Sequence, residues 1–277
     1  MNGTAMNGIG KMEAATRMGF AARGIMYLLI AFLALWWGRA EDGPDALKLL
    51  DSGAGRAILA VMALGFFAYG IWRLAEVFID SEGHGSKAKG LAVRAGGTVS
   101  GIIHLGLGVY TARLAAGQPA GASGGGSGGG GGTEEGAATA LSLPGGEWLL
   151  MLAAAALLGT AVVNLVKAIK GSFLKQLDSR AAAQDWVKWA GRGGYAARGV
   201  VFAIMAWFFW KAGAAASAEQ AGGLGEALGW LTGWPRMAVA IGLGLFGIFS
   251  LVEARYRRIN DPKVLARLQN AGRRLTP

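Results

Sequence analysis

The stretch Arg192-Gly193-Gly194-Tyr195-Ala196-Ala197-Arg198-Gly199 opens a long apolar run, and two other stretches share its pattern. Arg17-Met18-Gly19-Phe20-Ala21-Ala22-Arg23-Gly24 and Arg94-Ala95-Gly96-Gly97-Thr98-Val99-Ser100-Gly101 also read Arg-x-Gly-x-x-x-[Arg/Ser]-Gly. The three stretches align without gaps, and self-similarity of this kind is the signature of a repeated structural unit. The sequence therefore predicts three copies of one unit.

Each copy contains two segments that are long and apolar enough for a membrane helix, which needs about 20 residues. The chain is 53% hydrophobic and 16% charged, whereas soluble proteins are about 25% charged. A soluble helical bundle is the alternative, but soluble helices need a polar face. We therefore expect an all-α membrane protein with six transmembrane helices, at residues 19–38, 57–78, 96–115, 148–169, 194–213 and 237–256.

Positive charges mark one side of this six-span arrangement. Lys and Arg gather in the N-terminal segment, the second and fourth connections and the C-terminal tail, which share one side if there are six spans. Cytoplasmic segments of membrane proteins carry this excess. We therefore predict that both termini are cytoplasmic and that the net charge of +10 reflects membrane orientation rather than nucleic-acid binding.

The predicted division of the chain follows from the spans and their connections. Residues 117–146 include a run of glycines that predicts a flexible external loop, and residues 172–190 mix aromatic and basic residues, as interfacial helices do. The predicted units are an N-terminal cytoplasmic tail (1–16), repeat 1 (17–80), repeat 2 with that loop (92–171), the interfacial segment (172–190), repeat 3 (191–258) and a basic cytoplasmic tail (259–277).

The sequence resembles the bacterial membrane family called domain of unknown function 1206, whose repeated unit opens with a Gly-Tyr-Ala-Ala-Arg-Gly-like motif. Residues 194–199 match this motif, residues 19–24 match it nearly, and the middle copy departs from it at residues 98–100. The resemblance covers about residues 14–258. It implies a three-hairpin architecture in the bacterial inner membrane, and it supplies no catalytic residues because the family has no established activity.

The second span of each copy carries a weaker repeat, at residues 70–76, 161–167 and 247–253. Each copy crosses the membrane twice and so returns to the side from which it starts. The copies are therefore parallel repeats, which are related by an axis along the membrane normal. We expect three helical hairpins with pseudo-threefold symmetry.

Two ion pairs are predicted within the hairpins, because charged groups inside a membrane are costly and are usually paired. Arg23 and Glu76 occupy similar depths in the first copy, and Arg198 and Glu253 have the same relationship in the third. We predict the structural ion pairs Arg23–Glu76 and Arg198–Glu253.

The middle copy lacks both charges of this pattern, with Ser100 in place of Arg and Lys167 in place of Glu. A staple at the cytoplasmic interface is one interpretation of the pairs. The sharper one is that the unpaired middle copy lines a polar pocket for an anion or lipid head group. The candidate pocket residues are Arg73, Ser100, His104, Asn164 and Lys167.

No catalytic motif stands out, and we predict no cofactor and no metal. The chain has no cysteine, so thiolate zinc sites and iron–sulfur clusters are excluded. We favour a non-enzymatic membrane component that acts by helix packing, lipid binding or association with a larger membrane complex. Its expected partners are membrane lipids with anionic head groups, and another membrane protein or a second copy. A small-solute transporter along the repeat axis and a lipid-modifying enzyme are the alternatives.

Overall fold

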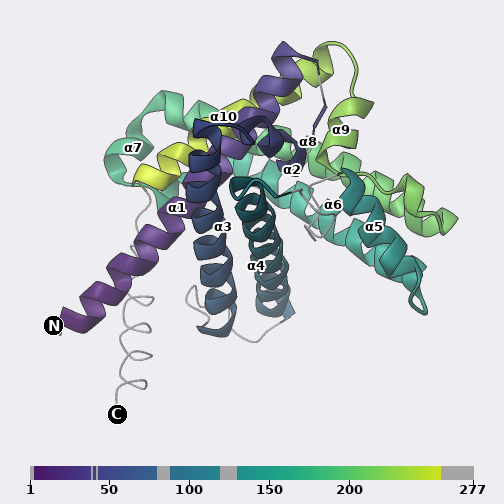
Figure 1. Ribbon diagram of the computed structural model, residues 1–277, viewed down its shortest axis with the longest axis horizontal. Helices are drawn as coiled ribbons and strands as arrows, with labels where there is room; N and C mark the ends of the chain where they lie inside the picture. The colour runs from purple at the N-terminus through teal and green to yellow at the C-terminus, as the bar shows by residue number, and fades with distance from the viewer. Residues whose placement is uncertain (1–2, 39, 42, 80–87, 119–129, 257–277) are drawn as a thin grey trace.

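The computed structural model describes residues 3–38, 40–41, 43–79, 88–118 and 130–256, and it is helical throughout this part of the chain (Figure 1). Five of the six predicted spans lie within helices, and the first, residues 19–38, extends two residues beyond the end of its helix. The long helices are α1 (Gly3–Trp36), α3 (Ala54–Ile79), α4 (Ala88–Ala115), α6 (Gly146–Lys170), α8 (Asp185–Ala215) and α10 (Trp234–Tyr256). The shorter elements are α2 (Gly43–Leu47), η1 (Lys48–Leu50), α5 (Gly130–Leu141), η2 (Ser172–Gln176), α7 (Ser179–Ala183), η3 (Ala218–Gln220) and α9 (Leu224–Trp230).

Five of the long helices are apolar and long enough to cross a membrane, judged by length and composition. They are α1, α3, α6, α8 and α10. Helix α4 has 28 residues, but its glycines and its histidine make it less apolar than the others. The described part of the chain is thus an all-helical, multi-pass membrane protein with five clear membrane helices.

The long helices pack in an order that differs from three separate hairpins. Helix α1 packs against both α3 and α10, α3 against α4, α6 against α8, and α8 against α10. Figure 1 shows α3 and α4 side by side, with α5 and α6 further away from them. The packing runs in one series from α4 through α3, α1, α10 and α8 to α6.

Helix α6 ends where the chain turns toward α8. Gly171 has φ of 64° and its N–H donates to the Lys167 carbonyl, a left-handed cap that glycine adopts without strain. Asp178 then caps α7, since its carboxylate accepts a hydrogen bond from the Arg180 N–H at 2.8 Å. The chain turns at these two caps, and residues 172–183 fold back over the N-terminal end of α8.

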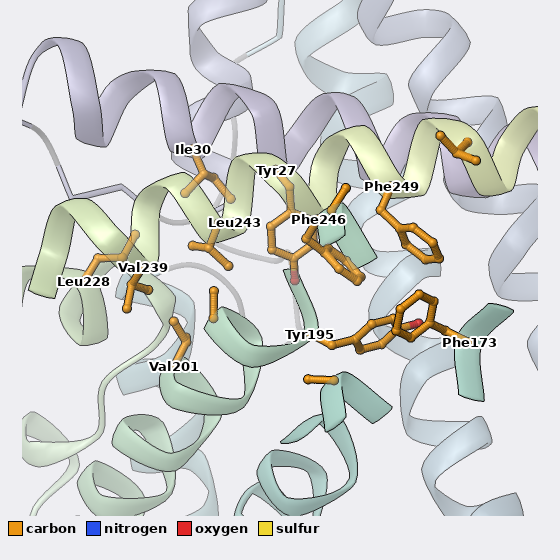
Figure 2. Packing of buried hydrophobic residues seen from close by; sticks show 14 of the residues in the cluster. Tyr27, Ile30, Phe173, Tyr195, Val201, Leu228, Val239, Leu243, Phe246 and Phe249 are labelled. Atoms are coloured by element: carbon orange, nitrogen blue, oxygen red, sulfur yellow. The ribbon is translucent and has the colours of Figure 1, made fainter. Parts of the chain in front are cut away.

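The largest buried cluster lies between α1, α8 and α10 (Figure 2). Tyr27 from α1 packs edge-to-face on Phe246 from α10, and Tyr195 from α8 also meets Phe246. Phe173 stacks on Tyr195 and contacts Phe249. Aromatic pairs of this geometry add to the stabilisation from burial alone, so these rings hold the three helices together.

Two connections are more ordered than predicted. Part of the glycine-rich loop forms α5, which buries Thr133 and Ala137 against α6 and its neighbours, because its alanines and threonines follow the helical period. Residues 119–129 of that loop lie outside the described residues. In the fourth connection, α8 already begins at Asp185, so a longer α8 with the short η2 and α7 replaces a separate interfacial helix. The basic tail also lies outside the described residues.

Candidate functional site

The contacts between neighbouring repeats use the same small residues three times. A Cβ added to Gly24 would lie 2.9 Å from the carbonyl oxygen of Gly247, and one added to Gly101 would lie 3.1 Å from that of Gly70. A Cβ on Gly199 would lie 3.3 Å from the carbonyl oxygen of Ala161. Small residues let helix backbones approach this closely. Each first helix of a repeat thus crosses the last helix of another repeat at a matching position.

The contacts within repeats 1 and 3 also match each other. A Cβ on Gly65 would lie 2.7 Å from the Met18 carbonyl oxygen and 3.2 Å from the Ala22 Cβ. In repeat 3, Gly242 occupies the same place opposite Gly193 and Ala197. Both repeats therefore close as tight hairpins through a glycine facing an alanine.

Repeat 2 lacks this contact. Its residues at the matching positions are Val99 and Ala156, and both are exposed, with Val99 at 57%. Gly96 matches Gly19, which crowds Tyr69, yet a Cβ on Gly96 would meet nothing within 4 Å. Among the described residues, α4 and α6 form no extended interface. Larger side chains replace the glycine and the alanine that close the other repeats, and the series of packed helices is not closed between α4 and α6.

Arg23 forms the best-defined ion pair, and its partner differs from the predicted one. Its Nη2 donates to the Glu253 carboxylate at 2.6 Å, and its Nε donates to the Ser250 hydroxyl at 3.3 Å. The guanidinium also lies over the rings of Phe20 and Phe246. This pair joins repeat 1 to repeat 3, so the predicted pairing of Glu253 within its own hairpin is wrong. The side chain of Glu76 lies outside the described residues.

Arg198 matches Arg23 in the repeat but has a different environment. Its guanidinium lies 4.4 Å from the Phe246 ring centroid and 5.1 Å from that of Phe202. Its Nε is buried without a hydrogen-bond partner, and no described carboxylate pairs with it. The physical reason follows from the packing order: α8 packs on α6, where Lys167 occupies the position that Glu253 holds on α10. A lysine cannot neutralise an arginine.

The five candidates for the polar pocket lie on three helices, α3, α4 and α6. His104 packs on Tyr69 with ring centroids 4.5 Å apart, and its Nδ1 lies 2.7 Å from the Ser100 carbonyl oxygen. Arg73 lies over the Trp72 ring and within electrostatic range of His104. These residues are thus brought together around α3 and α4.

Helix α6 holds the other two candidates in a more local role. Asn164 is buried and donates to the Thr160 carbonyl oxygen at 2.7 Å on its own helix, a bond that adds nothing between helices. The Lys167 ammonium lies 5.5 Å from the Tyr195 ring centroid. Neither residue has a described contact with His104, so the structure does not unite the five candidates in one pocket.

Sequence reasoning missed the aromatic and hydroxyl partners of the arginines. Ser250 and Phe246 contact Arg23, and Phe246 also contacts Arg198. Their signal was present in the second-span repeat, where Ser250 stands at the position of Arg73 and Asn164. A polar residue recurring at that position in all three copies marks the face that turns toward the first helix of the next repeat.

Comparison with known proteins places this multi-pass helical membrane protein in a family. The model of the family described as Domain of Unknown Function (DUF1206) matches residues 18–80, 95–171 and 193–257. The chain belongs to this family, and the triple match shows its threefold repeat.

A curated relative is similar to most of the chain. The chain is 28% identical over 260 residues to the "Uncharacterized protein YxxB" of Bacillus subtilis (strain 168), covering 89% of this chain and 92% of the relative. No solved structure matches the chain.

Proposed function

We propose that this protein is a six-span, non-enzymatic component of the bacterial cytoplasmic membrane that holds lipid in the opening of its middle repeat. The observation that carries the proposal is the interruption between α4 and α6, where apolar residues are exposed on both sides. In a bilayer such a surface is covered by acyl chains or by another membrane protein. Lipid is always present at high concentration, which favours lipid as the occupant.

The inclusion of α4 as the sixth span rests on its packing and its charges. It lies beside α3 (Figure 1), and no Asp, Glu, Lys or Arg stands between Arg94 and Arg113. With six spans, the Lys- and Arg-rich segments share the cytoplasmic side, and both termini are cytoplasmic.

Exposed tryptophans support the proposed ends of the spans, since tryptophan is enriched at both membrane–water interfaces. One group lies on α9 and at or near the ends of α1, α6, α8 and α10 that the six-span topology places outside, and a second lies at the cytoplasmic start of α8. The exposed residues of the first group are Trp36, Trp37, Trp148, Trp207, Trp210, Trp230 and Trp234, and those of the second are Trp186 and Trp189.

A pseudo-threefold arrangement is part of the proposal. It is supported by the matching glycine crossings at Gly24, Gly101 and Gly199. Under this symmetry each repeat has one contact between its own two helices and one contact with a neighbouring repeat. The middle repeat lacks the contact between its own two helices. The opening is then a specific departure from symmetry at one place in the ring.

The packing of aromatic side chains between the helices counts against the transporter alternative. The rings of Tyr27, Tyr195, Phe246 and Phe249 fill the space between α1, α8 and α10 (Figure 2). A water-filled path along the axis would need these rings to move apart. A lateral site for lipid needs no such rearrangement.

The occupant of the opening can be tested with a probe at Val99. The chain has no native cysteine, so Val99→Cys can carry a single fluorophore in reconstituted vesicles that contain nitroxide-labelled phosphatidylcholine. We expect strong quenching, as for the exposed control Val61→Cys on α3 and unlike the buried control Leu59→Cys. Protection of the Val99→Cys probe at the level of the buried control would overturn the proposal in favour of a protein partner or a second copy.

A further inference from the structure

Arg198 holds a positive charge for which the described side chains provide no counter-ion. Arginine stays protonated in proteins. Arg23, at the matching position, has the Glu253 carboxylate at 2.6 Å, whereas α6 presents Lys167 to α8 at the corresponding place. An uncompensated charge away from water is strongly unfavourable, so a stable fold with this arginine calls for an anion from elsewhere.

The aromatic rings around Arg198 meet only part of this need. The ring centroids of Tyr27, Phe202 and Phe246 lie 5.7, 5.1 and 4.4 Å from its guanidinium carbon. Aromatic rings stabilise a cation that lies over the ring face. The N–H donors of a guanidinium point outward in its plane and suit a phosphate or carboxylate. The buried Nε has no hydrogen-bond acceptor, so at least this donor is left for an oxyanion to satisfy.

The position of Arg198 connects it to the opening of the middle repeat. Its guanidinium points to α1 and α10 through Tyr27 and Phe246, and it lies within electrostatic range of His104 on α4. It therefore lies on the side of α8 that faces α1 and α10, and its electrostatic interaction with His104 directs it toward α4, which borders the interruption between α4 and α6. Arg23 is already paired with Glu253, so the charge that calls for an anion is that of Arg198.

We propose that Arg198 binds the phosphate of an anionic phospholipid whose acyl chains lie in the opening between α4 and α6. This inference rests on the proposed function and names the ligand of the same site. The exposed side chains of Val99 and Ile102 on α4 and Val163 on α6 offer the chains an apolar surface. Phosphate chemistry is shared by a lipid head group and inorganic phosphate, and an opening toward the bilayer favours the lipid.

The test measures head-group preference by native mass spectrometry of the full chain released from bilayers with equal phosphatidylglycerol and phosphatidylcholine. We expect the unmodified protein to retain phosphatidylglycerol preferentially. Arg198→Gln should lower that preference about tenfold, which is the size expected for hydrogen bonds to a charged group. Arg198→Lys keeps the charge without the planar fork and should lose less.

Arg192→Gln is the matched control, because Arg192 is an exposed arginine nearer the start of α8 whose guanidinium lies over the ring of the exposed Trp189. Its head-group preference should equal that of the unmodified protein. An equal preference in Arg198→Gln and Arg192→Gln would overturn the proposal. If Arg198→Gln fails to fold, the comparison of Arg198→Lys with Arg192→Lys decides in the same way.

Inorganic phosphate distinguishes the two sources of the anion. In bilayers of phosphatidylcholine alone, millimolar phosphate should leave the melting temperature unchanged if the ligand is a lipid. Thermal stabilisation by phosphate that Arg198→Gln abolishes, without any preference for phosphatidylglycerol, would overturn the lipid assignment. Quenching at Val99→Cys reports the presence of lipid in the opening independently, so the proposed function can stand when this inference fails.

Discussion

The first and third repeats close through a glycine facing an alanine, whereas the middle repeat has Ala156 and Val99 at those positions and stays open. The same chain thus shows the same hairpin in a closed and an open form. The difference amounts to a few added carbon atoms at one crossing point. Since membrane helices associate largely through close packing, such a small change is enough to separate two helices.

The largest expected difference in stability is between substitutions of Arg23 and Arg198, which occupy matching positions in the repeats. Arg23→Gln removes the guanidinium that lies 2.6 Å from the buried Glu253 carboxylate and should lower the free energy of unfolding by about 3 kcal/mol. Arg198→Gln removes a charge with no described partner, so in phosphatidylcholine its cost should stay below about 1 kcal/mol. Denaturant titration of both variants in the same bilayers measures the difference. Equal losses would show that Arg198 is paired as Arg23 is.

A smaller effect separates the glycines of the closed and open hairpins. Gly242→Leu forces a side chain against Ala197 and should destabilise the protein by about 1–3 kcal/mol. Gly159→Leu adds the same side chain on α6, where a Cβ meets nothing within 4 Å, and should change stability by less than about 0.5 kcal/mol. Comparable losses of stability in the two variants would mean that α4 and α6 are packed together.

The smallest expected effect comes from restoring the closed pattern. The double variant Val99→Ala with Ala156→Gly gives repeat 2 the small residues of Ala22 and Gly65. We expect stability to change by about 0.5 kcal/mol or less, but α4 and α6 should approach each other. A nitroxide quenching probe at Ile102→Cys on α4 should then be less accessible to labelled lipid than in the unmodified background. Unchanged quenching would show that other residues keep the hairpin open.

The helices and the repeat could be predicted from sequence because they depend on local patterns. Apolar runs of sufficient length located all six long helices, and the Arg-x-Gly pattern located the three copies. The partners of those helices could not be read in the same way. Arg23 on α1 pairs with Glu253 on the adjacent α10, which belongs to another copy, and the sequence pattern is equally compatible with pairing to the second helix of its own copy.

Charge matching favoured the wrong partner for a physical reason. Pairing within copies gives Arg with Glu twice and Ser100 with Lys167 once, which looks balanced. The structure instead places the first helix of each copy against the second helix of another, which leaves Arg198 opposite Lys167. Each positive side chain is expected to have a negative partner when the protein itself must neutralise every charge. A bound anion removes that requirement. The ordering of α5 was missed because the neighbouring glycines dominated the composition of its loop.

The central claim is that α4 and α6 stand apart, and disulfide formation tests it most directly. Val99→Cys with Ala156→Cys places a pair at the open crossing, and Ala31→Cys with Gly244→Cys places a control pair at the α1–α10 contact, where a Cβ added to Gly244 would lie 3.2 Å from that of Ala31 and needs to move only a few tenths of an ångström. A disulfide needs Cβ atoms roughly 3.5–4.5 Å apart, and the native chain has no cysteine to interfere. Under oxidation in native membranes, we predict that the control pair cross-links and that the Val99–Ala156 pair does not. Cross-linking of the Val99–Ala156 pair to the extent of the control would contradict the account.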